Sequence, residues 1–232
     1  MYKVLAVTLA RGGSKGIPRK NLANLAGRPL IDYTIDEAKK SSLIDRYIVS
    51  TDDLLIKDHV QKKGVDTPFV RPKNLSDDKA TSVAALKHAL LFCENEDGCK
   101  YDYVIELMCT NPFKKVKDID NCIEIITSRK VDSVIGVAKL DDHHPARIKK
   151  IENGYIQDFA VPEISSRRQD LKPDAYIRNG SIYALDRNRL IENKHRFGGS
   201  NSRPHIMPPE RGINIDSHLD LALCELLIKN MK

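Results

Sequence analysis

Hydrophobic runs of strand length alternate along the chain with helical stripes of hydrophobic residues. Residues 3–9 (KVLAVTL) form a continuous apolar run with several β-branched side chains, which is typical of a buried parallel strand. Further strands are expected at residues 47–50, 103–107, 133–137 and 181–184. Three helices are expected between them, each with its hydrophobic residues on one face. These faces are Ile31, Thr34, Ile35 and Ala38 in the first, Val83, Leu86 and Leu90 in the second, and Val116, Ile119, Ile123 and Ile126 in the third. This alternation predicts an α/β fold, a mostly parallel sheet with helices on both faces.

The pattern changes after residue 140. Residues 148–156 hold two short apolar segments around Asn153-Gly154, a dipeptide favoured in two-residue hairpin turns. The polar stretch at residues 165–174 follows and has no core pattern of its own. A small β-hairpin is therefore predicted here, in an appendage that we expect to act as a flap or a dimerisation arm.

The chain then returns to the sheet and ends in a helix. Ser217 and Asp220 have the spacing of a capping box, so this helix is expected to begin at Ser217. Four leucines are expected to pack it inward: Leu219, Leu223, Leu226 and Leu227. The predicted organisation is one α/β domain, residues 1–140 plus 175–232, with a hairpin and flap at residues 141–174.

Composition places the chain among ordinary globular proteins. Hydrophobic residues make up 41% of the 232 residues and charged residues 30%. No apolar run approaches the roughly 20 residues of a membrane span, and no signal-peptide cleavage region is visible, so we expect no membrane partner and a cytoplasmic location. The five cysteines include no Cys-x-x-Cys pair and are expected to be reduced thiols. The net charge of +6 fits an anionic ligand, while scarce aromatic residues and the lack of Trp argue against nucleic acid.

The most informative motif directly follows the first strand, where residues 10–21 read ARGGSKGIPRKN. Three glycines allow backbone N–H groups to approach phosphate oxygens closely. Four cations repel one another in this short loop unless an anion compensates them: Arg11, Lys15, Arg19 and Lys20. The loop matches neither the Walker A motif nor the dinucleotide G-x-G-x-x-G motif. It predicts a triphosphate site, with an exposed basic turn as the alternative.

With this loop, the chain resembles the N-acylneuraminate cytidylyltransferases, also called CMP-sialic acid synthetases, over nearly its whole length. The other matching segments are Ser50-Thr51-Asp52, Arg71-Pro72, Leu75-Ser76-Asp77, His144-Pro145, Arg167-Arg168-Gln169, Asn179-Gly180-Ser181-Ile182-Tyr183 and Ile215-Asp216. The resemblance implies a Rossmann-like nucleotide-diphospho-sugar transferase fold and a homodimeric enzyme of cell-surface glycan biosynthesis. The implied reaction joins CTP to a nonulosonic acid, giving the CMP-sugar and pyrophosphate.

The resemblance also implies roles for individual residues. Those expected to contact the nucleotide are Ala10, Arg11, Gly12, Gly13, Ser14, Lys15, Asn21, Arg71 and Ser82. Lys20 is expected to lie against the reacting phosphate, and Lys20, Arg11 and Asp216 form the implied catalytic set. Attack on the α-phosphorus needs positive charge near the phosphate oxygens and the leaving pyrophosphate, which fits these cations. A surface or helix-cap arginine is the alternative for Arg71, and a helix N-cap is the alternative for Ser82.

Magnesium is the cofactor that the resemblance implies. The family holds it with Asp-x-Asp at the end of the last sheet strand, where this chain has Asn214-Ile215-Asp216. One carboxylate is replaced by a neutral oxygen ligand, so we take Asp216 as the principal ligand and Asn214 as the second candidate. An acidic cap of the last helix is the alternative for Asp216. The base that accepts the sugar's hydroxyl proton is left open between Asp216 and a hydroxide on the metal.

The implied sugar pocket comprises Met108, Thr110, Arg167, Arg168, Gln169, Asn179 and Tyr183. An arginine fork matches the sugar carboxylate, although a solvated charge run is the alternative for the flap arginines. Met108 stands where the family typically has Gln, in a segment Leu-Gln-Pro-Thr-Ser-Pro. A thioether offers apolar surface instead of an amide's hydrogen bonds, so we expect a modified sugar of the legionaminic or pseudaminic type. The alternative is that Met108 only fills the core.

Two other functions are left open. One is a related nucleotidyltransferase for an eight-carbon acid sugar or a sugar phosphate, against which the segment at residues 167–169 argues. The other is a non-catalytic protein that binds a nucleotide or RNA on the same fold, and Asn214 is its best support.

Overall fold

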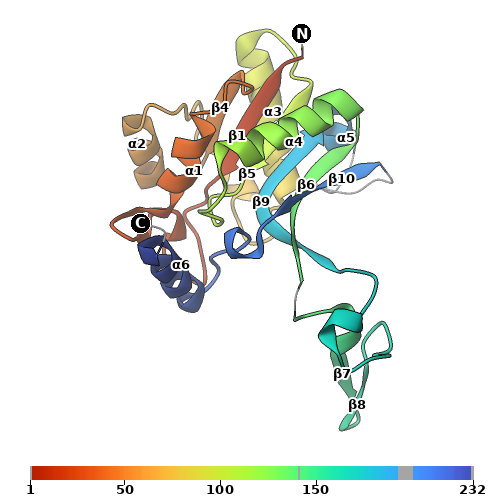
Figure 1. The fold of residues 1–232 in the computed structure, drawn as a ribbon. Coiled ribbons are helices and arrows are strands. Elements are labelled where there is room, and N and C mark those ends of the chain that lie inside the picture. Colours follow the sequence, from red (N-terminus) through yellow and green to blue (C-terminus); the bar gives the residue numbers. More distant parts are fainter. Residues whose placement is uncertain (1, 141, 193–200, 231–232) are drawn as a thin grey trace.

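A computed structural model describes residues 2–140, 142–192 and 201–230 (Figure 1). Asp141, where the predicted appendage begins, lies outside the described residues. A central sheet has the strand order β10-β6-β9-β5-β1-β4. Its strands are β1 (Val4–Leu9), β4 (Arg46–Ser50), β5 (Tyr103–Leu107), β6 (Ser133–Lys139), β9 (Tyr176–Asp186) and β10 (Ser202–Met207).

The sheet is parallel except at β9, which runs antiparallel to both β5 and β6. The prediction of a mostly parallel sheet is therefore confirmed. The strand expected at residues 181–184 lies in the second half of the longer β9. Because β6 and β9 are antiparallel, the chain joins them through the appendage without a crossover helix. The edge strand β10 was not predicted, since its sequence SRPHIM contains a proline and lacks an apolar run.

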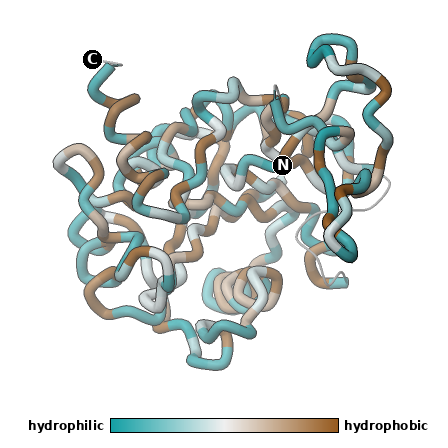
Figure 2. The backbone as a smooth tube through the Cα atoms, turned by 90° about the horizontal axis from the view of Figure 1, so that it is seen from below, coloured by the Kyte–Doolittle hydropathy of each residue, from teal (hydrophilic) through white to brown (hydrophobic). Residues whose placement is uncertain are grey.

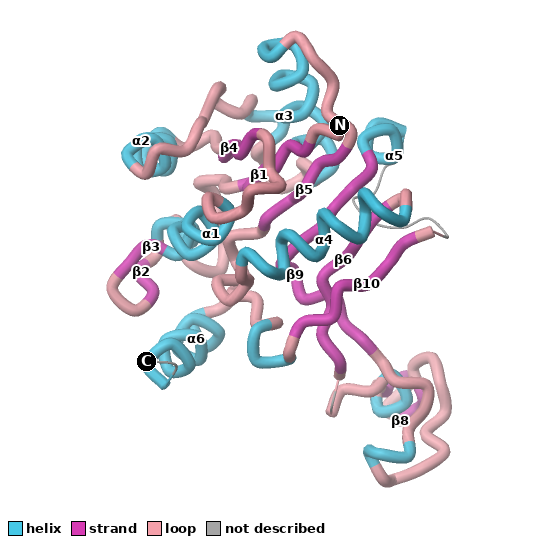
Figure 3. The backbone as a smooth tube through the Cα atoms, turned by 45° about the horizontal axis from the view of Figure 1, so that its top comes forward, coloured by secondary structure: helices cyan, strands magenta, loops and turns pink. Residues whose placement is uncertain are grey.

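Helices cover both faces of this sheet (Figures 1 and 3). The helices α1 (Leu30–Ala38) and α4 (Val116–Arg129) pack against one face, and α3 (Ser82–Asp97) and α5 (Arg187–Glu192) pack against the other. The helix α2 (Leu54–Lys62) lies beyond β4 and was not predicted, although Asp53 caps it by accepting from two backbone N–H groups. Each fully buried aliphatic side chain of these layers stabilises the fold by roughly 1.5–3 kcal/mol.

The last helix, α6 (His218–Asn230), has the predicted cap but not the predicted inner face. The Ser217 N–H donates to the Asp220 carboxylate at 2.7 Å, and the Asp220 N–H donates back to Ser217 Oγ at 3.3 Å. The inward packing expected for three leucines is wrong: Leu219, Leu223 and Leu226 are 78%, 43% and 56% exposed. The inner face is formed by Leu221, Cys224, Leu227 and Ile228. Apolar residues occur on both sides of this helix, so periodicity alone could not choose between them.

The appendage carries the predicted hairpin, a separate two-stranded sheet of β7 (Lys149–Glu152) and β8 (Tyr155–Asp158). Asn153 and Gly154 have positive φ angles of 53° and 81°, as a two-residue turn of this kind requires. The hairpin projects away from the rest of the molecule (Figure 1). We call residues 142–174 the arm and the other described residues the body. The hairpin is confirmed, whereas the division into domains stays a prediction.

Smaller features complete the fold. The strands β2 (Asn24–Leu25) and β3 (Arg28–Pro29) form a short hairpin before α1. Single turns of 3-10 helix are η1 (Lys20–Leu22), η2 (Lys73–Leu75), η3 (Pro145–Arg147), η4 (Arg168–Asp170) and η5 (Pro209–Arg211). All five cysteines are free, as predicted. Hydrophobic stretches run through the middle of the body (Figure 2), and no helix in the described part of the chain is long and apolar enough to cross a membrane.

Candidate active site

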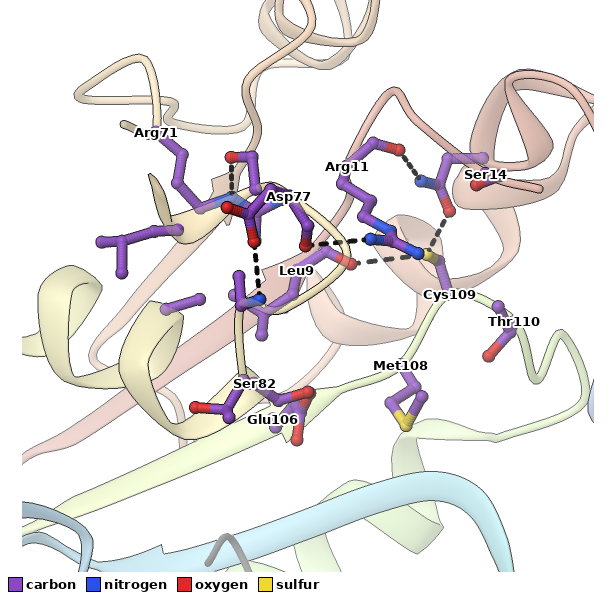
Figure 4. Close-up of a pocket in the computed structure, with 16 residues that line it drawn as sticks. Leu9, Arg11, Ser14, Arg71, Asp77, Ser82, Glu106, Met108, Cys109 and Thr110 are labelled. Carbon is purple, nitrogen blue, oxygen red and sulfur yellow. Dashed lines mark hydrogen bonds between the residues drawn. The ribbon is translucent and has the colours of Figure 1, made fainter. Parts of the chain in front are cut away.

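A cavity of about 220 Å³ lies at the carboxyl ends of β1 and β5 (Figure 4). Three segments far apart in the sequence line it: the glycine-rich loop, residues 71–85 and residues 106–110. The predicted site residues in its wall are Arg11, Ser14, Asn21, Arg71, Ser82, Met108 and Thr110. A more open groove of about 440 Å³ adjoins it and is lined by Arg11, Gly13, Ser14, Lys15, Ser76, Asp77 and Asp78. The fold therefore brings most of the predicted nucleotide residues and two predicted sugar residues into one connected site, whereas Ala10 and Gly12 line neither space.

Backbone contacts fix the first half of the glycine-rich loop. Ala10 is buried, and its N–H donates to Ser50 O at 2.9 Å. The Gly12 N–H donates to Asp52 Oδ1 at 3.0 Å, and a Cβ atom on Gly12 would lie only 2.7 Å from Asp53 Oδ2. Close approach to the segment after β4 thus requires glycine at position 12, in addition to any requirement set by a ligand.

The second half of the loop contacts the residue pair after β5 and the segment before α6. Asn21 Nδ2 donates to Arg11 O at 2.9 Å, and Asn21 Oδ1 accepts from the buried Cys109 thiol at 2.8 Å. A Cβ atom on Gly16 would collide with the carbonyl oxygen of Asp216. The loop is therefore packed between β5 and the segment before α6.

Carboxylates of the chain itself meet the cations of the loop. Asp78 lies 3.3 Å from Arg11 and 2.8 Å from Lys15, and Asp216 lies 2.7 Å from Lys20 Nζ. Charge repulsion alone therefore does not require a bound anion. Arg11, Lys15 and Asp78 are 38%, 76% and 53% exposed at their side chains, so their ion pairs are screened and weak. A triphosphate carries several negative charges and can replace Asp78 as their partner. Lys20 is more enclosed, at 14% exposed.

Arg71 carries an unsatisfied donor in the wall of the cavity. Its side chain is 4% exposed, and its Nε donates to Ser76 Oγ at 3.1 Å. One terminal nitrogen lies 3.7 Å from Asp52 and has no hydrogen-bond partner. Burial lowers the pKa of Arg71 below its ordinary value. A buried guanidinium nitrogen without a partner is costly, so this position favours an acceptor on a bound ligand. The alternative of a surface arginine is wrong.

Ser82 is the first residue of α3 and lines the same cavity. The helix is capped by Thr81, whose side chain accepts from the Ala84 N–H at 3.2 Å. The alternative interpretation of Ser82 as the N-cap is therefore wrong, because the helix begins one residue earlier than the apolar pattern indicated.

The residues predicted to bind magnesium lie where the segment before α6 meets the end of β5. The Ile215 N–H donates to Thr110 O at 2.8 Å, which brings these segments together. Asp216 accepts from Lys20 and from the Asn214 amide. Asn214 Oδ1 and Thr110 Oγ1 are buried without a hydrogen-bond partner. Ser217, and not Asp216, caps α6. Within the described ranges, no group of three His, Cys, Asp or Glu residues is close enough to hold a metal.

The remaining predicted sugar residues lie outside this cavity. Asn179 and Tyr183 are 3% exposed on β9, and the Asn179 amide donates to Met207 Sδ at 3.0 Å. Arg168 and Gln169 line a second cavity of about 230 Å³ at the base of the arm. Arg167 is 68% exposed and pairs with Asp170 at 3.4 Å. One copy of the chain therefore does not bring the flap arginines to Met108.

The sequence analysis missed two charged residues, one in the wall of the cavity and one buried behind it that bonds to the backbone of Met108. Glu106 is 1% exposed and lines the cavity; the signal was a carboxylate inside the buried strand YVIEL. Lys114 is completely buried, and its Nζ donates to Thr34 Oγ1 at 2.8 Å, to Met108 O at 2.7 Å and to Asn111 O. Burial lowers the pKa of Lys114 to about 7. Lysine is nearly always exposed, so no sequence pattern pointed to this role.

Comparison with known proteins identifies the family. The family model described as cytidylyltransferase matches residues 5–193, which include all the residues that line the cavity. The chain belongs to the cytidylyltransferase family. The resemblance noted in the sequence is thereby confirmed, and this cytidylyltransferase is an enzyme of the nucleotidyltransferase class.

Three relatives illustrate the range of this family. The chain is 32% identical to a pseudaminic acid cytidylyltransferase of Campylobacter jejuni, with 98% of the chain and 97% of the relative covered. It is 34% identical to a CMP-N,N'-diacetyllegionaminic acid synthase of Legionella pneumophila, with 98% and 97% covered. It is 32% identical to an N-acylneuraminate cytidylyltransferase of Streptococcus agalactiae, where 94% of the chain spans only 51% of the relative.

A solved structure supports the fold. It is a CMP:2-keto-3-deoxy-manno-octonic acid synthetase complexed with CTP, with a TM-score of 0.72, 18% identity, and 99% and 100% of the two chains covered. The predicted nucleotidyltransferase fold is confirmed by this likeness.

Proposed function

We propose that the chain transfers the cytidylyl group of CTP to a nonulosonic acid, giving the CMP-sugar and pyrophosphate. The observation that carries the proposal is the cavity between the glycine-rich loop and Arg71, with its unsatisfied guanidinium nitrogen, in a chain of the cytidylyltransferase family. The names of the relatives support the sugar class, because they act on pseudaminic, legionaminic and N-acylneuraminic acids.

In the proposed reaction, the anomeric hydroxyl oxygen of the sugar attacks the α-phosphorus of CTP in line with the leaving group. A bond forms between this oxygen and phosphorus while the hydroxyl proton passes to a general base, for which Asp216 is the candidate side chain. The bond from phosphorus to the bridging oxygen breaks, and pyrophosphate leaves with that electron pair. Arg11 and Lys15 lie where they can bind the leaving phosphates once Asp78 is displaced. Lys20, held at Asp216 and Ile215 O, would stabilise charge that develops on the reacting phosphate.

The oxygen atoms in and near the segment before α6 are of the type that binds a magnesium ion. Asp216 offers a carboxylate, and Asn214 Oδ1 and Thr110 Oγ1 are oxygens without partners. These are the hard ligands that Mg²⁺ takes in proteins. Asp216, Asn214 and Thr110 would hold the ion, which when bound supplies positive charge to the triphosphate.

The test of the function is to incubate the protein with CTP, magnesium and a set of acidic sugars, and to measure pyrophosphate and the mass of the nucleotide sugar. The set includes N-acetylneuraminate, legionaminic and pseudaminic acids and an eight-carbon acid sugar. Pyrophosphate release with nine-carbon acids alone supports the proposal. Turnover with the eight-carbon sugar alone, or CTP binding without any turnover, would contradict it.

We further propose that Met108 favours a deoxy or acylated sugar over N-acetylneuraminate. Met108 is half-buried and lines the cavity, which argues against a purely core-filling role. A sugar hydroxyl facing a thioether would lose a hydrogen bond, at about 1–3 kcal/mol, whereas a methyl group would gain contact there. Comparing kcat/KM for both sugars in wild type and Met108→Gln tests this. An unchanged ratio would contradict it.

We also propose that the enzyme is a homodimer in which the arm reaches the partner's site. The arm exposes many hydrophobic side chains, and Arg168 and Gln169 lie away from the cavity of their own chain. An exposed apolar surface of this kind is typical of an interface. Light scattering of the wild type should give the dimer mass, and Ile151→Asn with Ile156→Asn should shift it toward the monomer. A fully active wild-type monomer would contradict the proposal.

A further inference from the structure

Glu106 places a negative charge inside a site built for an anion. Its side chain is 1% exposed and belongs to the wall of the cavity that also contains Arg11 and Arg71. In Figure 4, Glu106 and Ser82 lie in the lower part of the view, with Arg11 and Asp77 above them. A carboxylate has several acceptor sites, so it can accept hydrogen bonds from a bound ligand in addition to those from the protein.

Strand alternation directs this side chain. Glu106 pairs with Val7 on β1 and with Tyr183 on β9, in the middle of the sheet. Its neighbours Ile105 and Leu107 pack on the face covered by α4, whereas Val104 packs under α3. Because side chains alternate along a strand, Glu106 points to the α3 side. The first turns of α3 contribute Ser82 and Ala85 to the same cavity.

Charge decides which part of a nucleotide can face Glu106. Arg11 lines both the cavity and the open groove, Arg71 lines only the cavity, and Lys15 lines only the groove. Triphosphate oxygens would be repelled by a carboxylate, so they belong on the side of the groove. The nucleoside then extends into the cavity. Apolar and small side chains that suit a flat base are Leu9, Leu75, Ala80 and Ala85.

We infer that Glu106 binds the nucleoside of CTP by accepting hydrogen bonds from its neutral N–H and O–H donors. The donors that a cytidine offers are the 4-amino group of the base and the ribose hydroxyls. A carboxylate is a good acceptor for the cytosine amino group and would face a carbonyl oxygen in uracil. A site built on such a bond rejects the analogue that lacks the donor. This inference rests on the proposed use of CTP and assigns a selectivity residue to it.

The test measures nucleotide affinity by calorimetry without sugar, so that sugar recognition does not enter. The variants are Glu106→Gln, which keeps the shape, and Glu106→Leu, which removes the acceptor. Glu124→Gln, on the exposed face of α4, is the matched control. We expect Glu106→Leu to raise the Kd for CTP about tenfold or more and Glu106→Gln to raise it about threefold. The Kd of the control should not change. Circular dichroism and thermal unfolding check that each variant is folded.

Binding of UTP and of 2′-deoxy-CTP shows whether the cytosine amino group or a ribose hydroxyl donates to Glu106. If the amino group is the donor, wild type binds CTP more tightly than UTP, and Glu106→Gln narrows that ratio. If the ribose is the donor, wild type binds CTP more tightly than 2′-deoxy-CTP, and Glu106→Leu abolishes that preference. If both folded variants bind CTP as tightly as the wild type, or if only the KM of the sugar changes, this inference is overturned and the proposed function is not affected. A wild type that binds no CTP would overturn the proposed function together with it.

Discussion

The body and the arm differ in where their hydrophobic and charged side chains find partners. In the body, Leu5 of β1 and Leu86 of α3 are completely buried. On the arm, Ile151, Ile156 and Ile164 are 78%, 74% and 79% exposed. Buried side chains in the body fix the loops that emerge from its strands, including the glycine-rich loop. The arm offers its hydrophobic surface to something outside its own chain, so its place in function depends on assembly.

The two regions differ in their ion pairs in the same way. Asp118, on α4, is 4% exposed and lies between His205 and Arg211. Asp174, on the arm, pairs with Lys139 and Lys172 in solvent. Since water and salt screen exposed pairs, only the buried network is expected to hold structure. The comparison therefore predicts large effects for changes in the body and small ones for like changes on the arm.

The largest expected effect is on kcat, which should fall when Lys20 is replaced and not when a lysine of the arm is replaced. Lys20→Ala should lower kcat about 100- to 1000-fold, because an electrostatic contact to the reacting phosphate is lost. CTP affinity and thermal stability should change little. Lys150→Ala on the hairpin is the matched control, since Lys150 is exposed and pairs only with Glu152 among the described ion pairs. Steady-state pyrophosphate assays check both variants, and near wild-type turnover of Lys20→Ala would break the comparison.

A second prediction concerns the buried Lys114. Lys114→Met removes the ammonium group and leaves Thr34 Oγ1 and two backbone carbonyls without this donor. We expect the free energy of unfolding to fall by about 2–3 kcal/mol, measured by urea denaturation. The control is Lys172→Met on the arm, where the side chain is 68% exposed and the expected change is below about 0.5 kcal/mol. Equal effects at the two positions would contradict the prediction.

A third prediction uses pH to compare Asp118 with Asp174. Burial alone would raise the pKa of Asp118, but hydrogen bonds from His205 and Arg211 hold it at about 2. A lowered folded pKa stabilises the protein above the ordinary value near 3.8, and this stabilisation is lost as pH falls from about 4 to 2. Asp118→Asn should therefore cost about 2 kcal/mol at pH 7 and much less at pH 2.

Asp174 supplies the control for this pH dependence. Hydrogen bonds from Lys139 and Lys172 also lower the pKa of Asp174 to about 2, but this carboxylate lies at the surface, with its side chain 36% exposed. Asp174→Asn should leave the unfolding midpoint within experimental error, at both low salt and about 1 M salt, where the Debye length is about 3 Å. A marked salt-sensitive loss of stability at Asp174 would show that the arm contributes to folding after all.

The smallest expected effect is on the arm's own hydrophobic residues. Ile151→Asn with Ile156→Asn should change the unfolding free energy of the monomer by less than about 0.5 kcal/mol, because both side chains are already exposed. Urea denaturation at the lowest usable protein concentration measures this without the contribution of association. A larger loss under these conditions would mean that the hairpin packs on the body of its own chain.

Features that depend on near neighbours in the chain could be predicted from the sequence alone. The strand at residues 103–107 and the helix containing Val116 and Ile126 agree with β5 and α4. The Asn153-Gly154 turn and the Ser217 cap were also predicted correctly. A buried run, a helical stripe or a turn dipeptide is set by residues a few positions apart, so the sequence contains the whole signal.

Features that depend on distant segments were decided only by the tertiary structure. Lys20 meets Asp216 from 196 positions away, and β9 runs antiparallel between β5 and β6. The inner face of α6 and the direction of Glu106 likewise depend on which element packs beside them. Long-range pairing follows from the path of the chain and the burial that it permits. No local pattern of hydrophobic and polar residues carries that information.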